Sequence, residues 1–355
     1  MTTSLRQVKQ IIMEKVLSII IPTYNMEKYL RKCLDSLIVS DEKMQRLEVL
    51  VINDGSKDSS SQIAHDFESK YPETFRVIDK ENGNYGSCIN RGLKEATGKY
   101  VKVLDADDYF MPKSLEEHLA LLFTTDADLV LTDYVLVGKD GSVKKKMSLP
   151  LEQNIEYEME QVCIKEGVID VQMHAVTYKL RNLIEFNYHQ TEGISYTDQE
   201  WIFLPMTTIQ RVVYQPLILY YYLVEREGQT MQSSVLNKSI SQQVICAINR
   251  LEDFKKRNLN LSGNMKCYLY HCLNRIVCYV YRATTMRALY SVNELEIFDN
   301  KIKSLNNEFY QQLESEAVNL GFFRFRYINF FRKNKKTAPI IIRMSYKIMY
   351  KLFHD

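Results

Sequence analysis

The chain has 355 residues, of which 46% are hydrophobic and 25% are charged. This composition is typical of a soluble globular protein and excludes an intrinsically disordered chain, and the length allows two domains or one domain with a large extension. The net charge of +2 conceals a basic segment, because residues 322–355 contain nine Lys or Arg residues and one acidic residue, Asp355.

The cysteines and the N-terminal segment indicate the compartment. Seven cysteines form an odd set with no Cys-x-x-Cys pair, which argues against a disulfide framework and against a zinc site. Residues 1–25 have no long apolar segment with a small-residue cleavage site, so we expect no signal peptide. No run of about 18 apolar residues occurs that would cross a bilayer. We therefore expect a cytoplasmic protein with reduced thiols.

The first 137 residues alternate strand-like and helix-like segments. Residues 16–25, VLSIIIPTYN, are a continuous apolar run that stops at Pro22, and residues 27–38 place their apolar side chains on one helix face. Further strand-like segments follow at 47–56, 75–82 and 99–108, separated by helix-like segments at 57–71 and 87–98. Repeated βα units predict an α/β fold with a mostly parallel sheet covered by helices on both faces.

Polar side chains follow three of the predicted strands, at the edge where such sheets bind ligands. They are Thr23 to Asn25, Asn53 to Ser56, and the acidic group of Asp105, Asp107 and Asp108. These three carboxylates repel one another unless a cation lies between them. Because no glycine-rich dinucleotide turn follows the first strand, a divalent metal ion, Mg²⁺ or Mn²⁺, is the expected counterion for a bound phosphate.

Five segments in this order resemble the inverting glycosyltransferases of family 2, which have the GT-A fold: SIIIPTYNMEKYLRKCLDSL, EVLVINDGSKDSS, NGNYGSCINRGLKEATGKYVKVLDADD, EGISYTDQEWIF and PLILYYYLVEREGQT. The resemblance covers roughly residues 15–232. It implies a metal-dependent transferase that moves a sugar from a nucleotide-sugar donor, usually a UDP-sugar, to a hydroxyl of a glycan or lipid-linked saccharide. Assembly of bacterial surface polysaccharides is a process that this activity would serve.

The resemblance also implies roles for individual residues. Thr23 and Tyr24 would border the base and ribose, and Asp54 would accept a hydrogen bond from the uracil ring. Asp107 would contact the metal ion, and Asp105 would contact the ribose or a metal-bound water. The full set of donor-binding candidates is Pro22, Thr23, Tyr24, Asn25, Asp54, Gly86, Asn90, Asp105, Ala106, Asp107 and Arg226. Taken alone, residues 53–56 are equally an ordinary turn, and Asp108 is equally a cap of the helix that starts near Pro112.

The chain departs from the family pattern at Ile89, where relatives often carry Arg or Lys before the Asn. The cation that assists the diphosphate would then be Arg91 or the metal ion alone, although an isolated helical Arg is more often a solvated surface residue. Arg226 lies in the segment EREGQT, where relatives carry a loop that closes over the diphosphate. An ordinary turn is the alternative interpretation of that segment.

The candidate catalytic base is Asp198, which takes the place of the family's Asp, with Thr197 in place of the preceding Glu. Glu200 is the second candidate, and both acids could instead cap the following helix. Tyr196 and Trp201 would stack on a sugar ring or pack in the core. We interpret four histidines as structural or surface residues: His118, His174, His189 and His271.

The C-terminal part reads as helical. We expect an N-terminal extension at 1–15, a glycosyltransferase domain at 16–232 with a nucleotide-binding half (16–137) and an acceptor half (138–232), an α-helical domain at 233–321 and a basic tail at 322–355. The tail has basic residues on one helix face (Arg343, Lys347, Lys351) and apolar residues on another (Ile341, Met344, Ile348, Leu352). It would lie on an anionic membrane at the inner face of the cell membrane, or pack on its own domain.

Other function classes stay open. A nucleotidyltransferase on a similar sheet would release pyrophosphate, but the sequence lacks a glycine-rich basic loop for a triphosphate. A non-catalytic protein that retains the nucleotide site is conceivable because of Ile89 and Thr197. Nucleic-acid binding by the basic tail ranks last, since the nucleotide-sugar site already accounts for the chemistry, and the sequence leaves the oligomeric state open.

Overall fold

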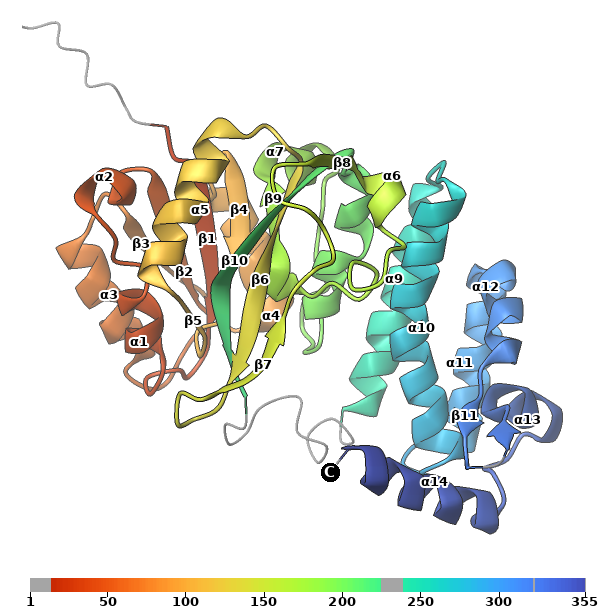
Figure 1. Ribbon diagram of the computed structural model, residues 1–355. Helices are drawn as coiled ribbons and strands as arrows, with labels where there is room; N and C mark the ends of the chain where they lie inside the picture. Colours follow the sequence, from red (N-terminus) through yellow and green to blue (C-terminus); the bar gives the residue numbers. More distant parts are fainter. Residues whose placement is uncertain (1–13, 225–238, 322, 355) are drawn as a thin grey trace, which may run out of the picture. The chain divides into compact units, whose positions relative to one another are not determined.

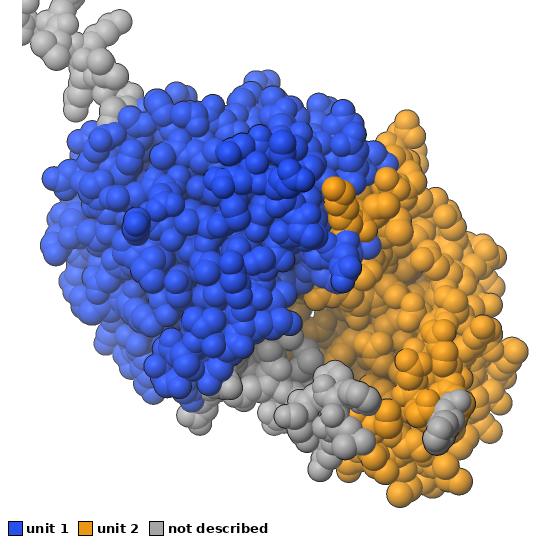
Figure 2. Space-filling view, viewed as in Figure 1, with its two compact units in different colours: residues 1–162, 166–193, 208–225 blue, residues 163–165, 194–207, 226–355 orange. Residues whose placement is uncertain are grey.

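The protein is described by a computed structural model that covers residues 14–224, 239–321 and 323–354, the last four of them by their backbone alone. The chain divides into two compact units, which Figure 2 shows in different colours. We call them the sheet unit, residues 1–162, 166–193 and 208–225, and the helical unit, residues 163–165, 194–207 and 226–355.

The sheet unit contains one ten-stranded sheet (Figure 1). Its strands are β1 (Leu17–Thr23), β2 (Leu47–Asn53), β3 (Phe75–Asp79), β4 (Tyr100–Val103), β5 (Tyr109–Phe110), β6 (Leu129–Val137), β7 (Val143–Met147), β8 (Glu156–Glu158), β9 (Val176–Lys179) and β10 (Arg211–Leu223). The main path runs β3-β2-β1-β4-β9-β6-β10-β5, and β7 and β8 pair with β6 and β10. Strands β1 to β4 pair in parallel, and β6 pairs in parallel with β10.

Strand β9 is antiparallel to both of its neighbours, β4 and β6. The residues just before β9 therefore lie at the same edge of the sheet as the last residues of β4. Every residue of β1 and β2 is buried, because continuous apolar strands are covered on both faces. The predicted α/β fold with a mostly parallel sheet is confirmed, and the antiparallel insertion of β9 is what the strand pattern did not predict.

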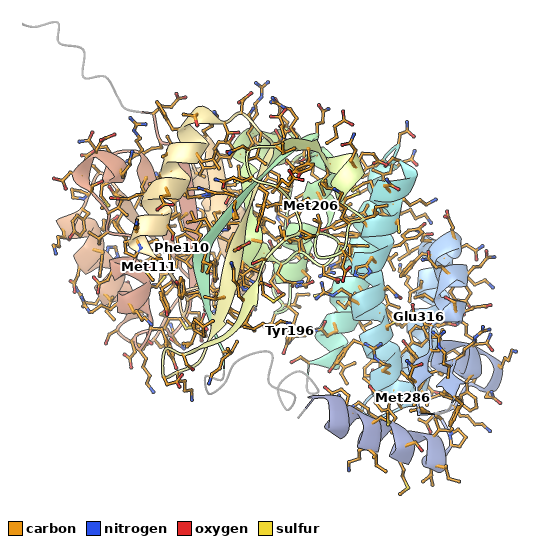
Figure 3. All side chains as sticks on the ribbon, in the orientation of Figure 1. Phe110, Met111, Tyr196, Met206, Met286 and Glu316 are labelled. Atoms are coloured by element: carbon orange, nitrogen blue, oxygen red, sulfur yellow. The ribbon has the colours of Figure 1, made fainter. Side chains whose placement is uncertain are left out.

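Helices flank the sheet in the order that the βα pattern predicts. They are α1 (Leu30–Asp35), α2 (Asp41–Met44), α3 (Ser60–Lys70), α4 (Asn84–Glu95), α5 (Pro112–Thr124), α6 (Met159–Val162), α7 (Leu180–Glu185) and the short 3₁₀ helix η1 (Met173–Ala175). Helix α4 packs on β1 and β2, and α5 packs on β10. Paired strands also bring aromatic rings together, as in the 5.5 Å edge-to-face contact of Phe110 on β5 with Tyr220 on β10 (Figure 3 labels Phe110).

The helical unit is built mainly from α-helices, as the C-terminal pattern predicts. Its elements are η2 (Asp198–Ile202), η3 (Leu204–Thr208, which ends at the unit boundary), α9 (Ile240–Arg257), α10 (Gly263–Thr285), α11 (Val292–Leu305), α12 (Asn307–Gln312), η4 (Leu313–Ser315), β11 (Val318–Asn319), β12 (Arg324–Phe325), α13 (Tyr327–Asn334) and α14 (Ile340–His354). Helix α10 is the buried centre, and α9, α11 and α13 pack against it. Among the described residues, no helix has the length and apolarity needed to cross a bilayer.

Candidate functional site

The carboxyl ends of the first strands meet at one edge of the sheet, as predicted. Thr23 at the end of β1 lies beside Asn53 at the end of β2, and Asn53 lies beside Asp79 at the end of β3. The backbone N–H of Asp54 donates to the carbonyl oxygen of Thr23 at 2.8 Å. The segments 23–25 and 53–56, far apart along the chain, therefore form one continuous rim.

Tyr24 lies on this rim and is 45% exposed. The following residue, Asn25, has a φ of 54°, in the left-handed region that Asn tolerates better than most residues. Its backbone N–H donates to Ser56 Oγ at 3.0 Å, and its Oδ1 accepts from the Lys57 N–H at 2.8 Å. The backbone is thus fixed while the tyrosine ring stays open to solvent, which suits a ring that stacks on a planar ligand.

Asp54 is buried and already paired with a cation. Its Oδ1 accepts from Lys80 Nζ at 2.5 Å and from the backbone N–H of Gly83 at 2.9 Å. Lys80 also donates to Ser87 Oγ at 2.9 Å. Sequence reasoning missed Lys80, although a lysine directly after the third strand, at the ligand-binding edge, was the available signal. It supplies a positive charge at the rim where the family pattern has lost one at Ile89.

Gly86 and Asn90 hold a neighbouring chain segment against α4. A Cβ atom on Gly86 would lie only 1.9 Å from the carbonyl oxygen of Thr191, so only glycine allows this approach. The side-chain Oδ1 of Asn90 accepts from the Gln190 N–H at 2.8 Å, and its Nδ2 donates to the Gln190 carbonyl at 2.8 Å. Both residues therefore have a structural role that is independent of any nucleotide.

Neither Ile89 nor Arg91 supplies a cation at the rim. Ile89 is fully buried on α4. Arg91 lies two residues later on α4 with its side chain 43% exposed, and its Nε donates to Glu95 at 2.9 Å in an i,i+4 pair. The interpretation of Arg91 as a solvated surface residue is confirmed.

The acidic loop after β4 is held by hydrogen bonds from distant segments. The Tyr85 hydroxyl donates to Asp105 Oδ1 at 3.0 Å. Asp108 is buried, and its two oxygens accept from the Tyr220 hydroxyl at 2.6 Å and from the Leu223 N–H at 2.7 Å. Burial, and then the charges of its two acidic neighbours, raise the pKa of Asp108 well above its ordinary value.

The hypothesis that Asp108 caps the next helix is wrong. The residue before the first turn of α5 is Met111, with no side-chain cap, and both Asp108 oxygens are engaged by β10. The carboxylate is turned into the sheet, toward a strand more than a hundred residues later. Within the same loop Ala106 is buried and Asp107 is half-buried.

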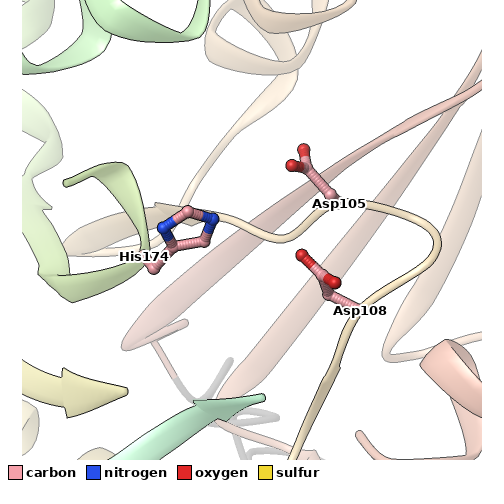
Figure 4. Close-up of side chains that lie close together, drawn as sticks. All are labelled: Asp105, Asp108 and His174. Carbon is pink, nitrogen blue, oxygen red and sulfur yellow. The ribbon is translucent and has the colours of Figure 1, made fainter. Parts of the chain in front are cut away.

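Asp105 and Asp108 lie close to His174, and Figure 4 shows the imidazole ring facing the two carboxylates. One potential ligand atom from each of the three side chains lies within 4.8 Å of the others. Carboxylate oxygens and imidazole nitrogens together are donors for first-row divalent ions, so this set fits a metal ion such as Mn²⁺. Sequence reasoning classed His174 as structural, because nothing along the chain places it beside residue 105.

The other histidine that the structure explains well is His118, which is buried on α5. Its ring bonds to Gln215 at 2.8 Å and to Thr177 Oγ1 at 3.1 Å. Burial lowers its pKa to about 3, so the ring is neutral. Its interpretation as a structural residue is confirmed.

The candidate bases Asp198 and Glu200 belong to the helical unit, on η2. The residue before η2 is Thr197, with no side-chain cap, and both acids lie in the first turn, where acidic side chains interact favourably with the helix dipole. Tyr196 (labelled in Figure 3) has a φ of 67°, a turned backbone just before the candidate base. Trp201 is 1% exposed, so it packs in the core and does not stack on a sugar. Arg226 lies outside the described residues.

Residues 18–185 match the sequence model described as glycosyl transferase family 2. This match places a glycosyltransferase family 2 domain in residues 18–185. MG025 of Mycoplasma genitalium, an uncharacterized glycosyltransferase, is 42% identical over 102 residues, 28% of this chain and 34% of MG025. EpsH of Bacillus subtilis is 26% identical over 261 residues, 67% of this chain and 72% of EpsH. The match thus spans about a third of the length of MG025 and under three quarters of the length of EpsH.

Solved structures show the same fold. S. aureus TarS, residues 1–349 in complex with UDP, superposes with a TM-score of 0.63 at 20% identity over 95% of this chain and 91% of that chain. The TarS complex with UDP-GlcNAc gives a TM-score of 0.52 at 21% identity over 85% of this chain and 94% of that chain. These likenesses confirm the GT-A type of fold expected of family 2.

Proposed function

We propose that this chain transfers a sugar, with inversion of configuration, from a nucleotide-sugar donor to a hydroxyl of a glycan or lipid-linked saccharide. The observation that carries the proposal is the convergence at one sheet edge of an open Tyr24, the Asp54–Lys80 pair and the acidic loop 105–108, within a family 2 domain. A base-binding carboxylate, a stacking ring and a metal-ligand group are what a nucleotide diphosphate requires.

The donor is proposed to be a UDP-sugar. TarS, which has the same fold, was crystallised with UDP and with UDP-GlcNAc, which supports uridine over other bases. Asp54, which is held by Lys80 and by the Gly83 N–H, would accept a hydrogen bond from the ring N–H of uracil. The rim beside the base would be formed by Pro22, Thr23 and Asn25. The contribution of Gly86 and Asn90 to donor binding would be indirect, because they hold residues 190 and 191 against α4.

The metal ion, Mn²⁺ or Mg²⁺, would supply positive charge to the leaving diphosphate. Asp105 and Asp107, with Ala106 between them, are the proposed contacts of the donor's ribose, phosphates and metal ion. Arg226 stays a proposed phosphate contact. Hydrogen bonds from Tyr85 to Asp105 and from Tyr220 to Asp108 hold the two ends of the loop, so only a small movement of the carboxylates would be needed.

Asp198 is the proposed base, with Glu200 as the alternative. Inversion in one step requires a carboxylate that takes the proton of the acceptor hydroxyl as the new glycosidic bond forms. Residues 138–232 are proposed as the acceptor half of a glycosyltransferase domain at 16–232. Thr197 is fully buried, so this departure from the family pattern has a packing role.

The C-terminal helix α14 is proposed to lie on an anionic membrane surface, which would suit a lipid-linked acceptor and a location at the inner face of the cell membrane. Four apolar side chains of α14 are 59–77% exposed: Ile340, Ile341, Met344 and Ile348. A helix that used this apolar face to pack on its own domain would bury these residues. Cosedimentation with phosphatidylglycerol vesicles tests the proposal, and Ile341→Glu should abolish binding while Ile297→Glu, 70% exposed on α11, should not.

Calorimetric titration of UDP into the full chain, with and without Mn²⁺, tests the donor site. We expect Mn²⁺-dependent binding that weakens by about tenfold or more in Asp107→Asn, followed by turnover when UDP-sugars are screened against lipid-linked acceptors. The exposed Asp140→Asn, on a loop before β7, is the matched control and should bind as the wild type does. Absence of UDP binding in both conditions would contradict the proposal, and tight binding without turnover on any acceptor would favour a non-catalytic nucleotide-binding protein.

A further inference from the structure

The group formed by Asp105, Asp108 and His174 is assembled from distant parts of the sheet unit. Asp105 and Asp108 come from the loop between β4 and β5, and His174 comes from η1, immediately before β9. Their nearest potential ligand atoms all lie within 4.8 Å. In Figure 4 one imidazole nitrogen points toward the two carboxylates. Around an ion with bonds of about 2.1 Å, ligand atoms are separated by roughly 3 to 4 Å, so a small inward movement closes the site.

The imidazole ring is held in place by aromatic packing. Its centroid lies 5.0 Å from that of Tyr134, 4.7 Å from that of Tyr220 and 4.5 Å from that of Tyr222. Tyr220 also donates its hydroxyl proton to Asp108 and accepts from the backbone N–H of Asp105. One tyrosine therefore orients the histidine and both acids toward one another.

The backbone of the histidine is held by a buried lysine. Lys102 on β4 has no exposed surface, and its Nζ donates to the carbonyl oxygens of His174 at 2.8 Å and Val176 at 3.0 Å. These bonds fix η1 to β4, the strand that leads into the acidic loop. A constellation positioned in this way before any ligand binds loses little conformational entropy on binding.

The local charge balance favours a cation. Asp108 is buried, and within the described residues it has hydrogen-bond donors but no Lys or Arg in ion-pair contact. Burial makes an unbalanced carboxylate costly, and two further carboxylates lie within three residues of it in the sequence. Lys102 does not balance this charge through a direct contact, because its amino group is bonded to backbone carbonyls.

We infer that His174 and Asp108 join Asp105 as protein ligands of one divalent cation, and that the imidazole nitrogen makes this site prefer Mn²⁺ over Mg²⁺. Mg²⁺ takes oxygen ligands almost exclusively, whereas Mn²⁺ and later first-row ions accept nitrogen readily. An ion with six ligands has room for these three and for oxygens of a diphosphate. The inference deepens the proposed function and rests on it for the identity of the donor, but not for the binding of the ion.

The first test is metal binding without any sugar donor. Mn²⁺ is titrated into the full chain, free Mn²⁺ is measured by its electron paramagnetic resonance signal, and Mg²⁺ is then added as a competitor. We expect His174→Ala to weaken Mn²⁺ binding by about tenfold or more and Mg²⁺ binding by less than about threefold. The matched control is His65→Ala, because His65 is 41% exposed on α3 and bonds only to Glu68 and Asp79 among the described residues. Equal Mn²⁺ affinities of wild type and His174→Ala would overturn the inference.

The second test needs no substitution, so a poorly folding variant leaves it intact. Electron spin-echo modulation of Mn²⁺ bound to the wild type should show a directly coordinated ¹⁴N nucleus, and the coupling should change when the protein is labelled with ¹⁵N-histidine. Bound Mn²⁺ without nitrogen coupling, or no saturable Mn²⁺ binding at all, would also overturn the inference. Nitrogen-coupled Mn²⁺ binding without turnover of any UDP-sugar would instead contradict the proposed function and leave the metal site standing.

Discussion

Lys102 is a charged residue in the centre of the sheet unit, between the buried Val101 and Val103 on β4. Its amino group has lost its water and gained two backbone carbonyls. Burial lowers its pKa from an ordinary value of 10.5 to about 7, because the desolvated ammonium is costly. A nonpolar side chain would fill the same space at no electrostatic cost, but it would not form the two hydrogen bonds that position η1 and His174.

This lowered pKa predicts how stability changes with pH. Between pH 7 and 10.5 the unfolded chain holds the Lys102 proton more tightly than the folded protein does, so deprotonation favours the folded state. The free energy of unfolding of the wild type, relative to Lys102→Met, should therefore rise with pH by up to about 1.4 kcal/mol per unit. Urea unfolding at pH 7, 8 and 9 measures it, and the exposed Lys94→Met should show no such trend. Parallel pH profiles of wild type and Lys102→Met would contradict the lowered pKa.

Helix α4 is the element that joins the nucleotide rim to segment 190–193. Its first residues follow the turn that binds Asp54, and its glycine and asparagine fix the later segment through Thr191 and Gln190. The N–H of Gly193 also donates to the carbonyl of Gly83 at 2.9 Å. A substitution that disturbs this contact should therefore weaken nucleotide binding at the rim and also lower the stability of the fold.

Gly86→Ala is predicted to force this segment away from α4, because the new Cβ would lie 1.9 Å from a backbone oxygen. We expect a loss of about 1 to 3 kcal/mol in the free energy of unfolding, a fall of several degrees in Tm and weaker UDP binding. Gly263→Ala at the start of α10 is the control, because nothing lies within 4 Å of its added Cβ. Differential scanning calorimetry compares the Tm values of the two variants. Equal Tm values would contradict the prediction, because they would show that segment 190–193 moves away from α4 without loss of stability.

Helices and strands were predictable from the sequence where their hydrophobic pattern lies within one short segment. The continuous apolar runs of β1 and β2 and the periodicity of α9 and α10 predicted these elements correctly. The helix expected at 27–38 is confined to α1, and the helix expected at 87–98 begins and ends three residues earlier, as α4. A Cβ atom on Gly98 would lie 2.6 Å from the Ser18 nitrogen, so this glycine allows close packing.

The parts of the site that sequence missed depend on nonlocal pairing. His174 reaches Asp105 only because β9 inserts antiparallel between β4 and β6, and a histidine far along the chain carries no signal of that register. Lys80 and Lys102 were missed because each looks like an ordinary lysine in or beside a strand. Only the tertiary structure shows one paired with a buried carboxylate and the other bonded to two carbonyls.

At the scale of the whole molecule, the proposed roles are divided between the two units. The described donor-binding and metal-binding candidates belong to the sheet unit, whereas Asp198 and Glu200 belong to the helical unit. If the proposed function is right, substitutions should separate nucleotide binding from turnover. Asp107→Asn should act on the affinity for UDP, and a change of the base should act on kcat alone.

Asp198→Asn is predicted to lower kcat by about 10² to 10⁴, the usual contribution of a general base, with the Kd for UDP unchanged within about twofold. The nearly isosteric change leaves η2 intact, because no cap of that helix is lost. Glu200→Gln on the same turn is the matched variant; Glu200 is only 7% exposed, so it is less accessible to an acceptor. UDP release in the presence of an accepted saccharide measures both. A larger loss of kcat in Glu200→Gln would make Glu200 the base, and full activity in both variants would rule out a carboxylate base on η2.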